Sequence, residues 1–234
     1  VKVDDQGKVD VMIGVSQSGQ GHETVFAQVA AEYLGASYDD VRVRGGDTAL
    51  IAYGFGTGAS RVAVNTGNAV LEAAEAVRAK AAKVAARLLE CDEKDVRVED
   101  SKAYVAGAPM TSISFAMLAK AALRDKNLAA MGGPGLIETK YYYPPSVTWS
   151  SGVNVAVVEV DPETGAWRCL SYVAVHDCGT QLNPMIVDGQ VLGGFAQGYG
   201  VALGESIHYD ETGQMLTGSM MDYPIPRADE IPPF

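Results

Sequence analysis

The amino-acid sequence predicts an α+β fold of two lobes, each a mixed β-sheet with packed helices. Strand-like and helical runs alternate irregularly along the 234 residues, which argues against a doubly wound parallel sheet. The pattern of the sequence changes from mainly helical to mainly strand-like at the linker-like segment 125–135, DKNLAAMGGPG. Its Gly-Gly-Pro-Gly run breaks regular structure. The predicted lobes are therefore residues 1–124 and residues 125–234.

The first lobe is expected to begin with a hairpin and to be dominated by helices. Gly35 is placed to stop a first helix. The Ala-rich residues 60–90 carry apolar side chains at helical spacing, enough for about 45 Å of helix at 1.5 Å per residue. In order, the expected elements are a hairpin at 1–15, a helix ending near Leu34, a strand at 41–47, a loop at 48–58, a helix at 60–90, a strand pair at 95–105 and a short helix at 114–123.

The second lobe is expected to be richer in strands. Two alternating apolar runs, 153–160 and 167–175, flank the segment 161–165, whose residues are typical of a hairpin turn. Asn183 followed by Pro184 is typical of a helix start, with asparagine as N-cap and proline at the first position. In order, the expected elements are a strand at 136–143, this hairpin, a helix from 184 to about 204 and a further hairpin around 209–213.

The helix after Pro184 contains more glycine than a helix tolerates without a reason, since each glycine costs about 1 kcal/mol relative to alanine. Close approach of another helix or of a bulky ligand to the backbone would explain it. A membrane span is the alternative, but four polar residues in and beside the helix argue against it. The glycines are Gly189, Gly193, Gly194, Gly198, Gly200 and Gly204; the polar residues are Asp188, Gln190, Gln197 and Glu205.

Charge and cysteine content exclude several classes of protein. The net charge of −11 disfavours nucleic acid as a partner, because phosphate binding requires surplus Lys and Arg. Cys91, Cys169 and Cys178 are far apart, without a Cys-x-x-Cys, so neither a disulfide framework nor an iron–sulfur cluster is expected. Isolated cysteines and the lack of a visible signal peptide predict a cytoplasmic protein.

Three loops rich in glycine and polar residues each adjoin a helix start: Gly19–Thr24, Gly54–Arg61 and Asp177–Asn183. Free N–H groups at such positions favour anionic oxygens, so the loops are candidates for holding a large anionic cofactor. Tight turns without a ligand are the alternative, and both interpretations stay open. At Cys178 a nucleophile and a merely packed thiol are likewise both possible, since no motif identifies a partner base.

Two familiar motifs fail in these loops. Gly54, Gly56 and Ala59 fit G-x-G-x-x-A, but the preceding strand ends about nine residues earlier, which disfavours a nicotinamide-dependent oxidoreductase. His22-Glu23 begins like the zinc motif His-Glu-x-x-His, but Phe26 occupies the second histidine position. No metal-ligand set is therefore assigned to this chain.

The loops resemble those of the molybdenum-cofactor-binding large subunit of the xanthine oxidase family, particularly carbon monoxide dehydrogenase and aldehyde dehydrogenase-like members. Residues 19–24 are similar to that family's GQGHET motif. Residues 54–61 are similar to its G-x-G-T-x-G-S-R loop, with Ala59 where glycine is usual. The remaining matches are Asp177–Thr180 with Asn183-Pro184, Gly189-Gln190, Gly193-Gly194, Gln197-Gly198, Leu216–Gly218, Met221–Tyr223 and Pro226–Ala228.

The resemblance implies a molybdopterin-binding portion of a molybdenum hydroxylase. Such enzymes oxidise an aldehyde, an N-heterocycle or carbon monoxide with water as the oxygen source. The implied cofactor is molybdopterin with molybdenum, in bacterial members often as the cytosine dinucleotide. The implied partners are the rest of the molybdenum subunit, an iron–sulfur subunit, an FAD subunit and a small-molecule substrate. The alternative is a non-catalytic structural or assembly module of the same fold.

The resemblance also assigns cofactor contacts. Gly19, Gln20 and Gly21 would lie near the molybdenum ligands and the pterin. Six further residues would bind the pterin or its phosphates: Thr57, Ser60, Arg61, Cys178, Thr180 and Asn183. The family's catalytic glutamate lies in a G-x-G-E-type segment that is not found here, so we assign no catalytic residue. Val1 is not a methionine and Phe234 follows a polar turn, so both ends are interpreted as cuts in a longer polypeptide or the borders of a split subunit.

Overall fold

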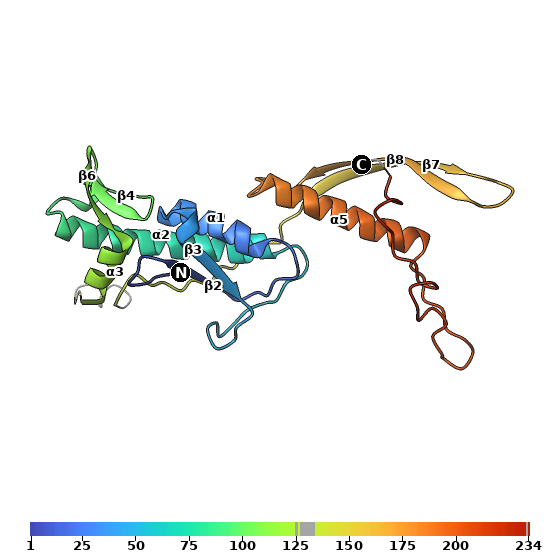
Figure 1. Cartoon of the computed structure of the whole chain (residues 1–234), viewed down its shortest axis with the longest axis horizontal. Coiled ribbons are helices and arrows are strands. Elements are labelled where there is room, and N and C mark those ends of the chain that lie inside the picture. Colours follow the sequence, from blue (N-terminus) through green and yellow to red (C-terminus); the bar gives the residue numbers. More distant parts are fainter. Residues whose placement is uncertain (125, 127–133, 233) are drawn as a thin grey trace. The chain divides into compact units, whose positions relative to one another are not determined.

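The computed structural model describes residues 1–124, 126, 134–232 and 234, and it confirms the predicted α+β class (Figure 1). The chain divides into two compact units, Val1–Val147 and Thr148–Phe234, which are described separately. The boundary expected at 124/125 falls at residues 125 and 127–133, which lie outside the described residues. The hydrophobic core identified among the described residues belongs to the first unit.

The first unit is built on a three-stranded sheet in the order β1-β2-β3. Strands β1 (Lys2–Val3) and β2 (Val9–Ile13) form the predicted hairpin, and β3 (Val41–Gly45) pairs parallel to β2 with Val11 opposite Val43. Alternate side chains of β2 are buried, as a period of two requires for a strand with one face on the core. The parallel pairing arises because a helix connects β2 to β3.

That connecting helix, α1 (His22–Leu34), lies alongside the long helix α2 (Val62–Leu88) (Figure 1). Gly35 ends α1 in the left-handed conformation, as predicted. The small residues near the start of α2 pack against α1: a Cβ placed on Gly67 would lie 3.6 Å from Phe26 Cε1. This is an ordinary contact distance, so Gly67 marks where α1 packs on α2 without the position requiring glycine.

A second small sheet and a helix complete the first unit. Strands β4 (Val96–Glu99) and β5 (Lys102–Val105) form the predicted pair, and helix α3 (Phe115–Arg124) follows as predicted. Strand β6 (Ala108–Ser114), which pairs with β5, was not predicted. Pro109 and the weak alternation of apolar and polar residues argue against a strand in the sequence. Short 3₁₀ turns precede β3 and β4 at Tyr38–Asp40 and Glu93–Asp95.

The strand predicted at 136–143 is wrong, because this segment only touches the sheet at its beginning. Ile137 forms an isolated antiparallel bridge with Lys2, and the Val3 N–H donates to the Leu136 carbonyl at 2.8 Å. Lys80 of α2 is 3% exposed and holds this segment in place. Its ammonium lies 2.6 Å from Glu138 Oε1 and donates to the Ile137 carbonyl at 2.9 Å.

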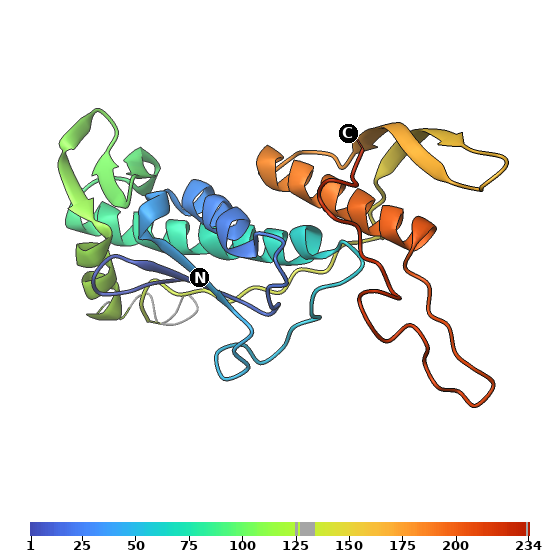
Figure 2. The ribbon, with the colours of Figure 1, turned by 45° about the vertical axis from the view of Figure 1, so that its right-hand side comes forward.

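The second unit is a long hairpin with one helix beside it (Figure 2). Strands β7 (Ser151–Val160) and β8 (Trp167–Asp177) pair antiparallel, as predicted. Helix α5 (Pro184–Leu203) begins with Asn183 as N-cap, whose Oδ1 accepts from Ile186 N–H at 3.1 Å. Among the described residues, no helix combines the length and sustained apolar character that crossing a bilayer requires.

We expect Lys80→Met to destabilise the first unit by about 3–5 kcal/mol, because it leaves the Glu138 carboxylate poorly compensated in a mostly buried position. Urea denaturation followed by circular dichroism measures the change in unfolding free energy. Lys120→Met, at an exposed position of α3, is the matched control. It should change the unfolding free energy by no more than about 0.5 kcal/mol. Equal effects of the two substitutions would contradict a structural role for the ion pair.

Candidate functional site

The first candidate loop connects β2 to α1 and contains the Gly19-Gln20-Gly21 sequence. Gln20 is half-buried, and its Oε1 accepts from the Ser18 N–H at 2.8 Å. Gly21 is the N-cap of α1 in the left-handed conformation, with φ of 71°. A side chain built on Gly19 would meet no described atom within 4 Å. The loop therefore has open space beside Gly19. The oxygen of the Gln20 amide is bonded to the backbone, and its NH₂ group has no hydrogen-bond partner among the described residues.

The second candidate loop runs from β3 to α2 and ends at Arg61, the N-cap of that helix. The Arg61 guanidinium donates to the Phe55 carbonyl at 3.0 Å and lies 5.3 Å from the centre of the Phe55 ring. Ala59 and Ser60 both have positive φ, 54° and 52°. Arg61 therefore connects Phe55, in the middle of the loop, to the start of α2. The turn at residues 59–60 immediately precedes that helix start.

Two contacts join these loops. Thr57 Oγ1 donates to the Ser16 carbonyl at 2.7 Å. The backbone at Gly54 approaches the end of β2 so closely that a Cβ on Gly54 would overlap the carbonyl oxygen of Gly14. The structure thus brings the loop of Gly19–Gly21 and the loop of Thr57, Ser60 and Arg61 next to one another.

His22 lies directly after the first loop and is buried, with 6% of its surface exposed. Its ring packs against Phe26 at a centroid distance of 5.6 Å. Its Nδ1 is buried without a hydrogen-bond partner among the described residues. Burial lowers the pKa of His22 below its ordinary value of 6.5, because the charged imidazolium loses hydration. The neutral ring is therefore favoured at this position, directly after the Gly19–Gly21 loop.

A cavity of about 290 Å³ is lined in part by the second loop. Its walls come from the end of β2, the first turns of α2, residues 50–55 and residues 138–143. Three of its aromatic side chains contact one another edge to face: Tyr53 with Phe55 at 5.2 Å and Phe55 with Tyr143 at 5.9 Å between ring centres. Phe55 therefore contacts both the aromatic rings of the cavity wall and the guanidinium of Arg61.

The third candidate loop, with Cys178, Thr180 and Asn183, belongs to the second unit and lies between β8 and α5. Asp177 Oδ1 accepts from the Gly179 N–H at 2.9 Å, which forms the turn after β8. Cys178 and Thr180 are exposed, and the side chain of Asn183 caps α5. The structure gathers these three residues at one helix start, as the sequence predicts.

The electrostatics of the two joined loops fit an anionic ligand. The first turn of α2 has no acidic residue, so its N–H groups and the positive end of the helix are not neutralised there by a carboxylate. Arg61 adds a full positive charge at the same helix start. Space is open beside Gly19 and Gly58, where an added Cβ would meet no described atom within 4 Å. These features fit a ligand with anionic oxygens.

Sequence reasoning missed three contributors to this site. The first is the contact between Gly14 and Gly54, although a glycine at the end of a strand is a known signal of close backbone approach. The second is the Ser16 carbonyl, which a sequence pattern cannot identify. The third is buried His22, which was considered only as a metal ligand. In the described part of the chain, no group of three or more His, Cys, Asp and Glu residues is arranged to hold a metal.

A sequence profile of the molybdopterin cofactor-binding domain matches residues 1–232. The nicotine 6-hydroxylase large subunit of Paenarthrobacter nicotinovorans is 41% identical over 100% of this chain and 29% of its own length. The carbon monoxide dehydrogenase large chain of Afipia carboxidovorans is 37% identical over 99% of this chain and 28% of its own. The chain therefore spans less than a third of the length of these relatives.

Solved structures agree with the sequence matches. Quinoline 2-oxidoreductase from Pseudomonas putida 86 superimposes with a TM-score of 0.84 at 40% identity, covering 99% of this chain and 30% of that one. A Cu,Mo-CO dehydrogenase superimposes with a TM-score of 0.85 at 37% identity, covering 99% of this chain and 29% of that one. The α+β fold of this chain is thus also found within a quinoline 2-oxidoreductase and within a Cu,Mo-CO dehydrogenase.

We expect Gly54→Ala to displace the second loop, because the new methyl group would overlap the Gly14 carbonyl. The loss of stability should be about 1–3 kcal/mol, with faster proteolysis of residues 46–61. Gly58→Ala in the same loop is the control, since its methyl group meets open space. Similar cleavage rates for the two variants would show that the close approach does not hold the loop.

We expect His22 to make stability pH-dependent in acid. Because its folded pKa lies below 6.5, the unfolded chain binds the proton first, and stability falls as pH drops below about 6.5 until the folded pKa is passed. His22→Leu removes this contribution. Urea denaturation of both proteins from about pH 8 to pH 5 gives the difference in unfolding free energy, which should change with pH in that direction. A pH-independent difference would contradict a neutral, buried His22.

Proposed function

Because the chain belongs to the molybdopterin cofactor-binding domain family, we propose that it forms part of the pterin-binding wall of a molybdenum hydroxylase. The observation that carries this proposal is the joining of two loops through Thr57 and Ser16 at the starts of α1 and α2. The first turn of α1 carries Glu23, whereas the first turn of α2 has no acidic residue and adjoins Arg61, so the N–H groups at the start of α2 suit a ligand with anionic oxygens.

Within this site each candidate residue has a proposed part. Gln20 has an NH₂ group that can donate to an oxygen on the cofactor while its Oε1 stays bonded to Ser18. Ser60 and Arg61, at the start of α2, would bind phosphate or pterin oxygens, Arg61 by a charge-assisted hydrogen bond. Thr57 acts indirectly, because its hydroxyl is bonded to Ser16 and holds the loops together.

The third loop is a further proposed cofactor contact, in the second unit. Cys178 and Thr180 are exposed at the start of α5, where a thiol, a hydroxyl and helix N–H groups are accessible to a ligand. Asn183 would contribute through the cap it forms on α5, which keeps that start in place.

The proposed reaction is oxidation of a small molecule, an aldehyde, an N-heterocycle or carbon monoxide, with water as the oxygen source. When bound, the molybdenum cofactor, in molybdopterin or cytosine dinucleotide form, supplies the redox chemistry. The chain's own residues bind and orient it. Names such as nicotine 6-hydroxylase and quinoline 2-oxidoreductase among the relatives support an N-heterocycle first. Iron–sulfur and FAD partners, and a cytoplasmic location consistent with three free cysteines, belong to this proposal.

The test is a chimera in which this chain replaces the aligned region of the Paenarthrobacter nicotinovorans large subunit, made in a molybdenum-competent host. We expect near-stoichiometric molybdenum and pterin in the purified chimera. Thr57→Val should weaken cofactor retention about fivefold, because losing one hydrogen bond of about 1 kcal/mol loosens the paired loops. Molybdenum and pterin per protein after gel filtration are the measurements.

Thr57→Ser is the matched control, because it keeps the hydroxyl and should keep the cofactor. A folded chimera without molybdenum or pterin would overturn the proposal and favour a non-catalytic structural or assembly module. Equal cofactor retention in Thr57→Val and Thr57→Ser would remove the paired loops as its basis.

A further inference from the structure

The second unit exposes a continuous apolar face on its hairpin. On this side of the sheet, β7 and β8 place only valines opposite one another in two successive pairs, Val153 with Val175 and Val155 with Val173. Val157 extends the row beside Ser171. Each of these valines has at least 50% of its surface exposed. We call these residues, Val153, Val155, Val157, Val173 and Val175, the valine face.

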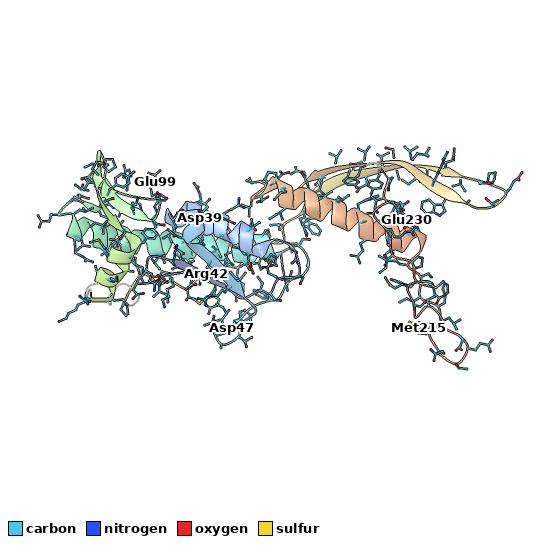
Figure 3. All side chains as sticks on the ribbon, in the orientation of Figure 1. Asp39, Arg42, Asp47, Glu99, Met215 and Glu230 are labelled. Atoms are coloured by element: carbon cyan, nitrogen blue, oxygen red, sulfur yellow. The ribbon has the colours of Figure 1, made fainter. Side chains whose placement is uncertain are left out.

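The valine face is the side of the hairpin away from α5. Tyr172 points toward the helix, since its ring lies 4.2 Å from that of Phe195, and neighbouring residues of a strand point to opposite sides. Val173 and its partner Val155 therefore point away from α5. Figure 3 shows side chains projecting from this side of β7 and β8 without an element of the second unit over them.

Polar residues border the valine face at both ends. Arg168 Nε lies 2.6 Å from Glu159 Oε2 at one end. Ser151 pairs with Asp177 at the other end. An exposed apolar patch with a polar rim is typical of a protein interface, whereas an antiparallel sheet facing water usually carries polar side chains on that side.

Helix α5 independently indicates that the second unit is covered by another polypeptide segment. Its 20 residues include a single charged residue, Asp188, and a helix that is apolar all round is normally buried. Only Gly200 of this helix is buried within the chain. Cβ atoms on Gly189, Gly193 and Gly194 would meet no described atom within 4 Å. A hairpin of two strands is marginally stable by itself, and α5 covers it on one side.

We propose that the valine face is an interface whose occupant is the remainder of a large-subunit polypeptide of this family, which covers it with an apolar layer. The relatives have more than twice as much polypeptide outside the aligned region as inside it, and the same fold occurs within those longer chains. This inference rests on family membership and does not require cofactor binding.

A second copy of this chain fits the observations less well. The exposed apolar side chains of α5, such as Met185 and Val201, belong to the layer on the other side of the sheet. One self-complementary contact on the valine face would leave these uncovered. Stable interfaces bury about 800 Å² on each partner, more than five half-exposed valines supply, so a partner that covers both sides of the unit is favoured.

The experiment is co-expression of this chain, carrying an affinity tag, with the Paenarthrobacter nicotinovorans large subunit from which the aligned region has been deleted. We expect the two polypeptides to co-purify. Val155→Lys with Val173→Lys should reduce the co-purified partner at least tenfold, because two charges would be buried in an apolar contact. Ala166→Lys, in the exposed turn of the same hairpin, is the matched control and should leave the yield unchanged.

The same variants in the chain alone separate loss of contact from loss of folding. Because Val155 and Val173 are exposed there, the double variant should keep the wild-type circular dichroism and melting temperature. Absence of co-purification by the wild-type chain, or wild-type yield with the double variant, would overturn the proposal. A wild-type dimer in light scattering that the double variant converts to a monomer would identify a second copy as the occupant and also overturn it.

Discussion

The candidate site depends on a backbone contact between the end of β2 and the loop that leads into α2. Gly14 and Gly54 lie so close that neither position has room for a side chain. This contact brings Thr57 within hydrogen-bond distance of Ser16, and so sets the two ligand loops side by side. A site of this kind is built from backbone proximity first, and the functional side chains are arranged on the loops that result.

The arrangement of α1 and α2 serves the same purpose. Phe26 of α1 packs against α2 at Gly67, and the two helices lie alongside one another and start near the joined loops. Arg61 is then the strongest positive group of the helix start, and α2 has no carboxylate in its first turn to neutralise it. His22 directly follows the first loop and is buried. Burial lowers its pKa, so the neutral ring adds no charge to the site. The anion-binding site that we propose therefore lies where α2 begins.

The two units differ in how they are stabilised. The first has a core of valine, alanine and phenylalanine side chains, with the buried Lys80–Glu138 pair fixing the returning segment. The second has a hairpin and a helix whose apolar side chains are largely exposed within the chain. Within the second unit, ring contacts of Tyr172 with Phe195 and of Trp167 with Tyr199 hold α5 against the hairpin.

The sequence by itself determined most of the local structure of this protein. The strand and helix periods of β2, α2, β7 and β8, the stop at Gly35 and the cap at Asn183 depend on residues close in the chain, and all were predicted. The motifs of the loops indicated the family for the same reason, since each motif is a short local pattern.

Only the tertiary structure decided which of these local pieces meet. Strand β6 forms despite Pro109 because β5 offers it a partner, and residues 138–143 stay irregular because the contact of this segment with β1 ends after the bridge at Ile137. The pairing of Gly14 with Gly54, of Thr57 with Ser16 and of Lys80 with Glu138 joins residues 40 or more positions apart, and no local pattern encodes such distances. The physical reason is that these contacts are selected by packing of the whole unit, after the local elements have formed.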